Sequence, residues 1–144
     1  AKANGFDHVI DYTSTDFEAE VMRLTNGEGV NVAYDSVGND TMGRTITSTK
    51  RRGTIIAFGQ SSGPYTDFKI TDLSKGSYYL SRPTLFHFVG DRSWLDTASA
   101  KLFKTVTDGT INVSINQRFA LEDVAKAHEA LTGRATTGCT ILNV

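Results

Sequence analysis

Residues 54–63, TIIAFGQSSG, decide the fold, because a short apolar run there ends in glycine and small polar residues. A second stretch repeats this pattern at residues 30–40, where VNVAYD runs into SVGND. Short apolar runs bounded by turn residues are typical of strands. TIIA is apolar at every position, as expected of a parallel strand that is buried on both faces. The two stretches therefore predict parallel strands of an α/β sheet.

Helix signals alternate with these strands, as in β-α-β units. Thr15 and Glu18 match a capping box at the start of one helix, and Gly27 follows its end. Asp40 is placed to cap a helix that runs to Arg52. The remaining predicted elements are the last turn of a helix at 1–5, strands at 8–12 (HVIDY), 77–81 (SYYLS), 111–115 (INVSI) and 136–144 (TTGCTILNV), and helices at 91–109 and 121–133.

The composition is that of one globular domain. The 144 residues are 39% apolar, which is enough to bury a core. They include 15 basic and 16 acidic residues, so the chain lacks the excess of positive charge with which proteins bind nucleic acid or an anionic membrane. Cys139 is the only cysteine, which excludes an internal disulfide and a cysteine-rich zinc site. Because no signal-peptide pattern opens the chain and no apolar run approaches the roughly 20 residues that span a bilayer, we expect a cytoplasmic protein.

The ends of the predicted strands are the candidate binding site. In an open parallel sheet a ligand lies beyond the carboxyl ends of the strands, where the loops diverge and N–H groups are free. Glycine at such an end removes the Cβ that would hold a ligand away from the backbone. Short donors and acceptors come from Ser36, Gln60, Ser61 and Ser62, and Tyr12 ends a third predicted strand. The alternative is a pair of tight turns, in which the same residue types are common.

No familiar nucleotide motif accompanies these strand ends. GEG at residues 27–29 follows a helix and precedes a strand, which is the reverse of the setting of a G-x-G-x-x-G pyrophosphate turn. His128 falls on an apolar helical face and is expected to be structural. Cys139 is expected to be a small buried apolar residue. Arg134 follows a helix end, where it is either a solvated charge or a clamp for a phosphate.

An ordered series of stretches resembles one enzyme family. YDSVGNDT, KRRGTIIAFGQSSG, SRPTL, FALEDVAKAHEAL and GRATTGCTILNV together resemble the carboxyl-terminal part of zinc-independent NADPH:quinone oxidoreductases, the zeta-crystallin-like branch of the medium-chain dehydrogenase/reductase superfamily. The resemblance covers essentially the whole chain. It implies an α/β fold in which residues 1–110 form a partial Rossmann-like parallel sheet with flanking helices, missing the first two strands. Residues 111–144 would be a strand-helix-strand that returns to a GroES-like catalytic domain.

The resemblance also implies a cofactor and its contacts. The cofactor would be NADPH, the substrate a quinone, and no metal would take part. Tyr12 would lie near the adenosine end, Ser36 at the cofactor rim, and Arg134 would be a late arginine that contacts the cofactor. The residues along the ribose and nicotinamide would be Phe58, Gly59, Gln60 and Ser61, with Pro83, Thr84 and Leu85 beside the nicotinamide amide. Gln60 stands where relatives often have Asn.

The same resemblance carries expectations about assembly. The two missing strands would lie between HVIDY and VNVAYD, so HVIDY is expected to be detached or newly paired, or copies of the chain to associate at the open edge. The edge strand Ser77–Ser81 implies a homodimer that continues the sheet. Two other functions stay open: a non-catalytic dimerisation or interaction module, and an enoyl or alkenal reductase on the same scaffold. No catalytic residue is nominated, and the fragment alone is expected to be inactive.

Overall fold

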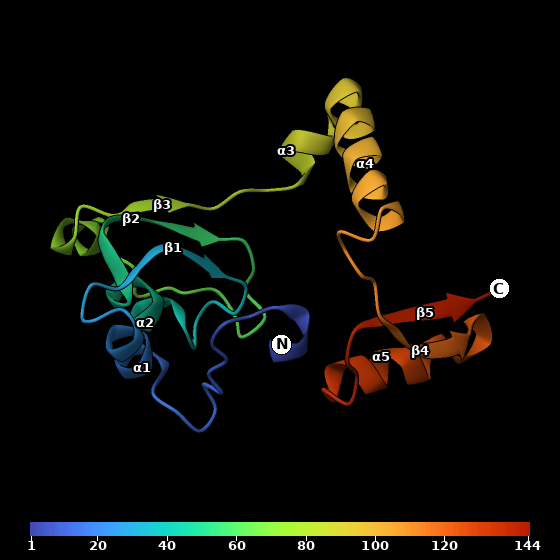
Figure 1. Ribbon diagram of the computed structural model, residues 1–144, viewed down its shortest axis with the longest axis horizontal. Helices are drawn as coiled ribbons and strands as arrows, with labels where there is room; N and C mark the ends of the chain where they lie inside the picture. Colours follow the sequence, from blue (N-terminus) through green and yellow to red (C-terminus); the bar gives the residue numbers. More distant parts are fainter. The chain divides into compact units, whose positions relative to one another are not determined.

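The computed structural model describes all 144 residues, which form two compact units, Ala1–Leu85 and Phe86–Val144 (Figure 1). Each unit contains a parallel sheet of its own, with three strands in the first and two in the second. The chain is therefore α/β throughout, as the sequence predicts. None of its helices combines the length and apolar character that a membrane crossing requires.

The sheet of the first unit has the strand order β1-β2-β3, and all three strands are parallel. β1 is Val30–Asp35, β2 is Thr49–Ala57 and β3 is Tyr79–Ser81. Asp35 pairs with Ala57 across β1 and β2, so these two strands end at the same level. The predicted strands at VNVAYD, TIIA and SYYLS are thus confirmed.

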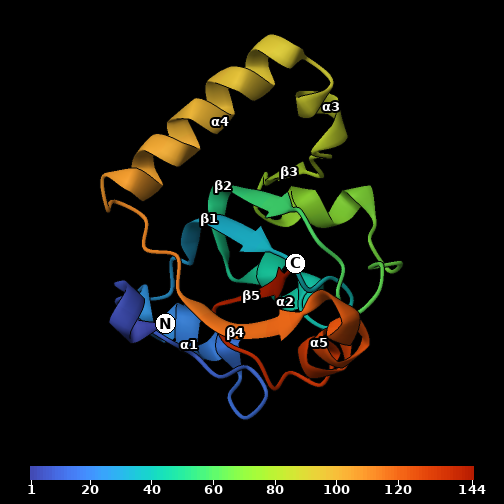
Figure 2. The same ribbon diagram turned by 90° about the vertical axis from the view of Figure 1, so that its right-hand side faces the viewer.

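Two helices lie on one side of this sheet, α1 (Phe17–Leu24) and α2 (Met42–Thr47) (Figures 1 and 2). α2 packs on β2, and α1 packs on α2, where the guanidinium of Arg44 lies 4.7 Å from the ring centre of Phe17. The core between α2 and the sheet consists of Met42, Ile46, Ile55 and Ala57. The first unit therefore has one hydrophobic core, on the α2 side of its sheet.

The other face of the same sheet carries large side chains that remain exposed. Val32 is 47% exposed, Tyr34 73% and Tyr79 65%. In parallel strands, paired residues point to the same face, and Val32 pairs with Thr54, which pairs in turn with Tyr79. These side chains therefore form one apolar face, which we call the open face of the sheet.

The second unit begins with two helices and continues as a strand-helix-strand. Its elements are α3 (Phe86–Val89), α4 (Arg92–Thr107), β4 (Ile115–Ala120), a 3-10 turn (Leu121–Asp123), α5 (Val124–Thr132) and β5 (Cys139–Asn143). Asp91 caps α4 by accepting hydrogen bonds from the N–H groups of Ser93 at 2.9 Å and Trp94 at 3.2 Å. β4 and β5 are parallel, as expected of strands joined by a helix.

The prediction of a strand at HVIDY is wrong. Residues 8–12 form no strand and pair with no strand of either sheet. A turn replaces it, in which Asp11 accepts hydrogen bonds from the N–H of Thr13 at 3.0 Å and, through its carbonyl, from the N–H of Thr15 at 2.9 Å. This result matches the expectation that the segment would be detached.

Several other boundaries differ from the prediction, among them the start of the third strand, which is Tyr79 and not Ser77. α2 ends at Thr47, and residues 49–52 belong to β2, whose first residue, Thr49, pairs with Val30 of β1. The predicted strand at 111–115 instead starts at Ile115, where pairing with Cys139 begins. Asp16, not Thr15, caps α1, because its carboxylate reaches the N–H groups of Glu18 and Ala19. At the start of the chain, Lys2–Asn4 forms a single 3-10 turn, closed by Gly5 in the left-handed conformation at φ 89° as predicted.

Candidate functional site at the strand ends

Two loops meet at the carboxyl ends of β1 and β2. We call residues 36–40 and 58–63 together the rim. Backbone N–H groups of the second loop donate to the first, from Ser61 to the carbonyl of Ser36 at 3.2 Å and from Ser62 to that of Val37 at 2.8 Å. The hydroxyl of Ser62 adds two bonds, donating to the carbonyl of Val37 at 2.8 Å and accepting from the N–H of Asp40 at 3.0 Å. The rim is therefore one hydrogen-bonded structure.

Glycine is required where the two loops touch. A Cβ on Gly38 would lie 2.5 Å from the carbonyl oxygen of Gly63, and φ of 91° at Gly38 is also unfavourable for a side chain. A Cβ on Gly59 would overlap the carbonyl oxygen of Ser36. The sequence suggests that these glycines let a ligand approach the backbone. The structure gives them a second role, which is close packing of one loop against the other.

Asp35 organises the base of the rim, and the sequence reasoning missed it. Its carboxylate is buried, with the residue 4% exposed, and accepts four hydrogen bonds. The donors are the N–H groups of Val37 at 2.9 Å and Gly38 at 2.8 Å, and the hydroxyls of Thr41 at 2.7 Å and Thr45 at 2.8 Å. The signal was present, because Asp35 ends an apolar strand and the two threonines are one helical turn apart.

The predicted binding residues of the rim lie together and face solvent. Ser36, Gln60 and Ser61 are exposed, and none of their side chains makes a hydrogen bond within the protein. Phe58 is 52% exposed, and its ring meets that of Tyr34 edge-on, with centroids 6.5 Å apart. The rim thus combines a fixed backbone with free polar groups and an exposed aromatic ring.

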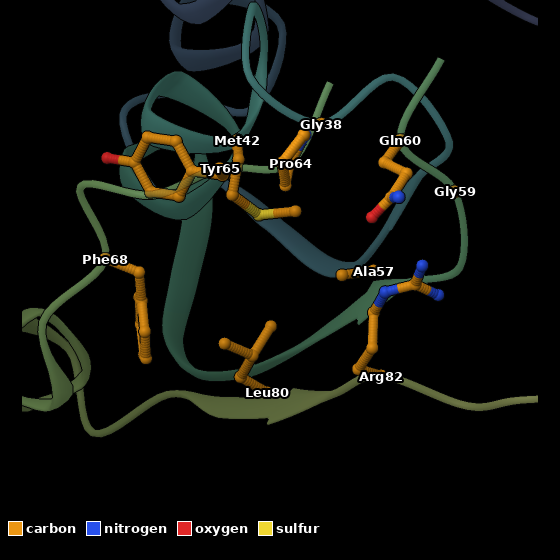
Figure 3. Close-up of a pocket in the computed structure, with 10 residues that line it drawn as sticks. All are labelled: Gly38, Met42, Ala57, Gly59, Gln60, Pro64, Tyr65, Phe68, Leu80 and Arg82. Carbon is orange, nitrogen blue, oxygen red and sulfur yellow. The ribbon is translucent and has the colours of Figure 1, made fainter. Parts of the chain in front are cut away.

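An apolar hollow of ≈ 210 Å³ lies beside the rim (Figure 3). Met42, Tyr65, Phe68 and Leu80 form much of its wall, and Gly38 and Gly59 of the rim also line it. The polar ends of Gln60 and Arg82 lie on the same side of the hollow, next to Ala57 (Figure 3). Such a hollow can accept a flat apolar group with polar atoms at one end.

Tyr12 lies at a second hollow on the rim. This hollow of ≈ 270 Å³ is lined by Tyr12, Ser36, Tyr34 and Asp35, among others. Tyr12 and Ser36 therefore come together as predicted, although the segment that carries Tyr12 is a loop.

The other predicted contact residues lie elsewhere. Pro83, Thr84 and Leu85 follow β3, the third parallel strand, and Leu85 is 66% exposed. Arg134 belongs to the second unit, where it follows α5 with an exposed side chain and φ of 55°.

Two structural predictions in the second unit are corrected. Cys139 is exposed, not buried, at the first residue of β5. His128 is also exposed, although its neighbour Ala127 is buried. The chain contains no group of three or more His, Cys, Asp or Glu side chains that could hold a metal ion.

Comparison with known proteins identifies the family. Residues 4–142 match the family described as zinc-binding dehydrogenase. A quinone oxidoreductase of Pseudomonas aeruginosa is 40% identical over 143 residues, covering 99% of this chain and 44% of that protein. A 2-haloacrylate reductase of a Burkholderia species is 36% identical over 144 residues, covering 99% and 43%.

The fold agrees with this relationship. The crystal structure of Escherichia coli quinone oxidoreductase complexed with NADPH superimposes with a TM-score of 0.88 at 38% identity, covering 95% of this chain and 43% of that one. The chain thus spans less than half the length of these relatives. It belongs to the zinc-binding dehydrogenase family, with quinone oxidoreductases among its relatives.

Proposed function

We propose that this chain is part of an NADPH-dependent quinone reductase, in which its rim holds the nicotinamide half of the cofactor. The complete enzyme would transfer hydride from NADPH to a quinone. The names of the relatives support this reading, as does the NADPH complex of one of them. The observation that carries it is the rim itself, which presents unpaired polar side chains on a fixed backbone at the ends of two parallel strands.

The residues present fit a dinucleotide. The hydrogen bonds between the loops set the rim before any ligand arrives, so binding does not have to order it. Ser36, Gln60 and Ser61 have free side-chain donors and acceptors for ribose hydroxyls, and the exposed ring of Phe58 offers a flat apolar contact. These are the contacts that a sugar and a flat ring require.

We assign the remaining contacts by the family resemblance. Tyr12 would lie near the adenosine end, Gly59 along the nicotinamide riboside, and Pro83, Thr84 and Leu85 beside the nicotinamide amide. Arg134 would contact the cofactor from the second unit. When bound, NADPH supplies the hydride, and the residues of this chain would orient the nicotinamide and exclude water from it. No metal and no general acid are part of the proposal.

The proposal includes the organisation of the complete protein. Residues 1–110 would belong to the cofactor-binding domain, and residues 111–144 would return to the catalytic domain. The separate sheet formed by β4 and β5 supports a division of the chain, although the two compact units divide at Leu85 and not at residue 110. The complete protein would be a cytoplasmic homodimer joined along Ser77–Ser81.

Isothermal titration of this chain and of the complete protein with NADPH tests the binding role. We expect the complete protein to bind NADPH and the isolated chain to bind it weakly and to be inactive. Micromolar binding by the chain alone would exclude a purely non-catalytic interaction module. Failure of the complete protein to bind at millimolar NADPH would contradict the proposal.

The reaction is tested by NADPH oxidation with a panel of quinones, enones and 2-haloacrylate. NADPH deuterated at the transferred position of nicotinamide C4 should slow quinone reduction in single turnovers if hydride transfer limits that step. We expect the highest kcat/KM with quinones. A preference for enones or 2-haloacrylate would keep the cofactor role and change the substrate.

A further inference from the structure

Asp35 is a buried carboxylate without a cation. No Lys, Arg or His forms an ion pair with it, and only hydrogen-bond donors surround it. Burying a charge is costly unless the group is fully satisfied. Four donors at 2.7–2.9 Å supply that satisfaction here. These hydrogen bonds hold neighbouring segments of the chain together, and each carboxylate oxygen holds a different segment.

Oδ1 holds the first loop of the rim, and Oδ2 holds α2. Oδ1 accepts from the N–H groups of Val37 and Gly38, which directly follow the exposed Ser36. Oδ2 accepts from the hydroxyls of Thr41 and Thr45. The carboxylate therefore fixes the position of the loop relative to the helix below it.

The backbone of Asp35 holds the second loop. Its carbonyl accepts from the N–H of Phe58 at 2.9 Å and lies 3.3 Å from the N–H nitrogen of Gly59. The next carbonyl, that of Ser36, accepts from the N–H of Ser61. One residue thus connects α2 and both loops of the rim.

We infer that Asp35 is the positioning residue of the rim, which holds Ser36 and the segment from Phe58 to Ser61 in place for the nicotinamide half of the cofactor. This inference rests on the function proposed above. Asp35 would act through its neighbours and would not contact the cofactor. It would do so by accepting hydrogen bonds, so its negative charge would not be needed.

Two substitutions in the complete protein separate these possibilities. Asp35→Asn keeps one oxygen for Val37 and Gly38, and its amide can donate to the two threonine hydroxyls, which also accept. Asp35→Ala removes all four acceptors. We expect Asp35→Ala to raise the Kd for NADPH by at least about tenfold, as loss of two or more hydrogen bonds predicts, and Asp35→Asn to change it by less than about threefold.

Amide hydrogen exchange without cofactor measures the rim independently. We expect Asp35→Ala to accelerate exchange at Ser61 and Ser62, and Asp35→Asn to leave it near the wild-type rate. Ile46→Ala is the matched control, because it opens a cavity in the core below the rim, at a residue that is 3% exposed. It should lower overall stability while leaving the Kd for NADPH near the wild-type value.

Each outcome decides the inference. An unchanged Kd in Asp35→Ala would overturn it, as would an equal rise in Ile46→Ala, which would indicate general loosening. An Asp35→Asn protein that is folded but binds as poorly as Asp35→Ala would overturn the hydrogen-bonding account. If the wild-type protein does not bind NADPH, the proposed function fails, and the exchange rates alone then decide whether Asp35 fixes the rim.

Discussion

The carbonyl oxygen of Ser36 occupies the space that a side chain on Gly59 would need. The α-carbon of Ser36 would also lie only 2.8 Å from a Cβ at this position. Both contacts involve backbone atoms, which cannot turn aside as the end of a flexible side chain can. Adding a methyl group must therefore move one loop of the rim.

Gly59→Ala should destabilise the protein by about 1–3 kcal/mol, the usual range for overpacking a well-packed site. Urea unfolding measures the change. Gly43→Ala is the control, because its Cβ would meet only the hydroxyl end of Tyr65, at 3.3 Å, and alanine favours the helix there. Equal destabilisation by both substitutions would contradict the packing role of Gly59.

Gln60 tests the cofactor contact at the rim. Its amide makes no hydrogen bond within the protein, so a change in NADPH binding after its substitution would reflect the loss of a direct contact with the cofactor. Because one hydrogen bond contributes about 0.5–1.5 kcal/mol, Gln60→Leu should raise the KM for NADPH by roughly 2- to 13-fold in the complete enzyme. Gln60→Asn, which keeps the amide, should raise it less. Similar KM values for all three proteins would place Gln60 outside the site.

Arg134 tests the contact proposed from the second unit. Arg134→Ala should raise the KM for NADPH with little change in kcat, because the lost interaction would bind the ground state and transition state alike. Lys126→Ala is the control, since Lys126 is an exposed cation in the same unit, paired with Asp123 at 2.8 Å. If both substitutions had the same small effect, Arg134 would be a solvated charge.

Stability should fall in acid. The pKa of Asp72 is lowered from its ordinary 3.8 by hydrogen bonds from the N–H of Lys69 and from Lys75. The pKa of Asp108 is lowered by the hydroxyl of Thr110 and by Lys104, and that of Glu28 is lowered from 4.5 by Lys50. A carboxylate with a lower pKa in the folded state stabilises the fold above its unfolded pKa, and this contribution is lost as the pH falls through the folded value.

The free energy of unfolding should therefore be level near pH 6 and decline below about pH 4.5. Urea unfolding at pH 6, 4 and 3 measures it. Asp72→Asn should make the decline shallower, because it removes one of the titrating groups. A decline of unchanged slope in Asp72→Asn would show that Asp72 does not contribute.

The edge strand β3 tests the proposed homodimer. β3 pairs with β2 alone, so its other edge is free, and Tyr79 on this strand is 65% exposed. A lysine on an edge strand opposes pairing with another strand. Tyr79→Lys should shift the complete protein from dimer to monomer in sedimentation velocity. Ile70→Lys changes another large hydrophobic residue, which is 75% exposed and lies outside the strands, and it should leave the dimer intact.

The sequence predicted the strands with strong local patterns. VNVAYD and TIIA can be recognised as strands because their apolar runs end in glycine and small residues. The two loops that follow them do lie side by side, at the carboxyl ends of β1 and β2. Asp91 was correctly predicted to start a long helix, because its cap is local. Features set within a few residues were therefore readable.

The errors arose where a distant partner decides the structure. HVIDY has the composition of a strand, but a strand forms only when a neighbour accepts its backbone hydrogen bonds. The charges of residues 50–52 favour the end of a helix, whereas the pairing of Thr49 and Thr54 with β1 places these residues within β2. The role of Asp35 is only partly visible in the sequence, because two of its four donors are hydroxyls 6 and 10 residues later.

The open face of the sheet has a practical consequence for anyone who purifies this chain. Aromatic and aliphatic groups of Val32, Tyr34 and Tyr79 stay accessible to water in the native structure. The fluorescence of probes such as ANS, which rises when they bind apolar surfaces, should therefore increase on addition of the folded chain. Dye fluorescence will thus be a poor measure of unfolding for this chain, and near-UV circular dichroism will be a better one.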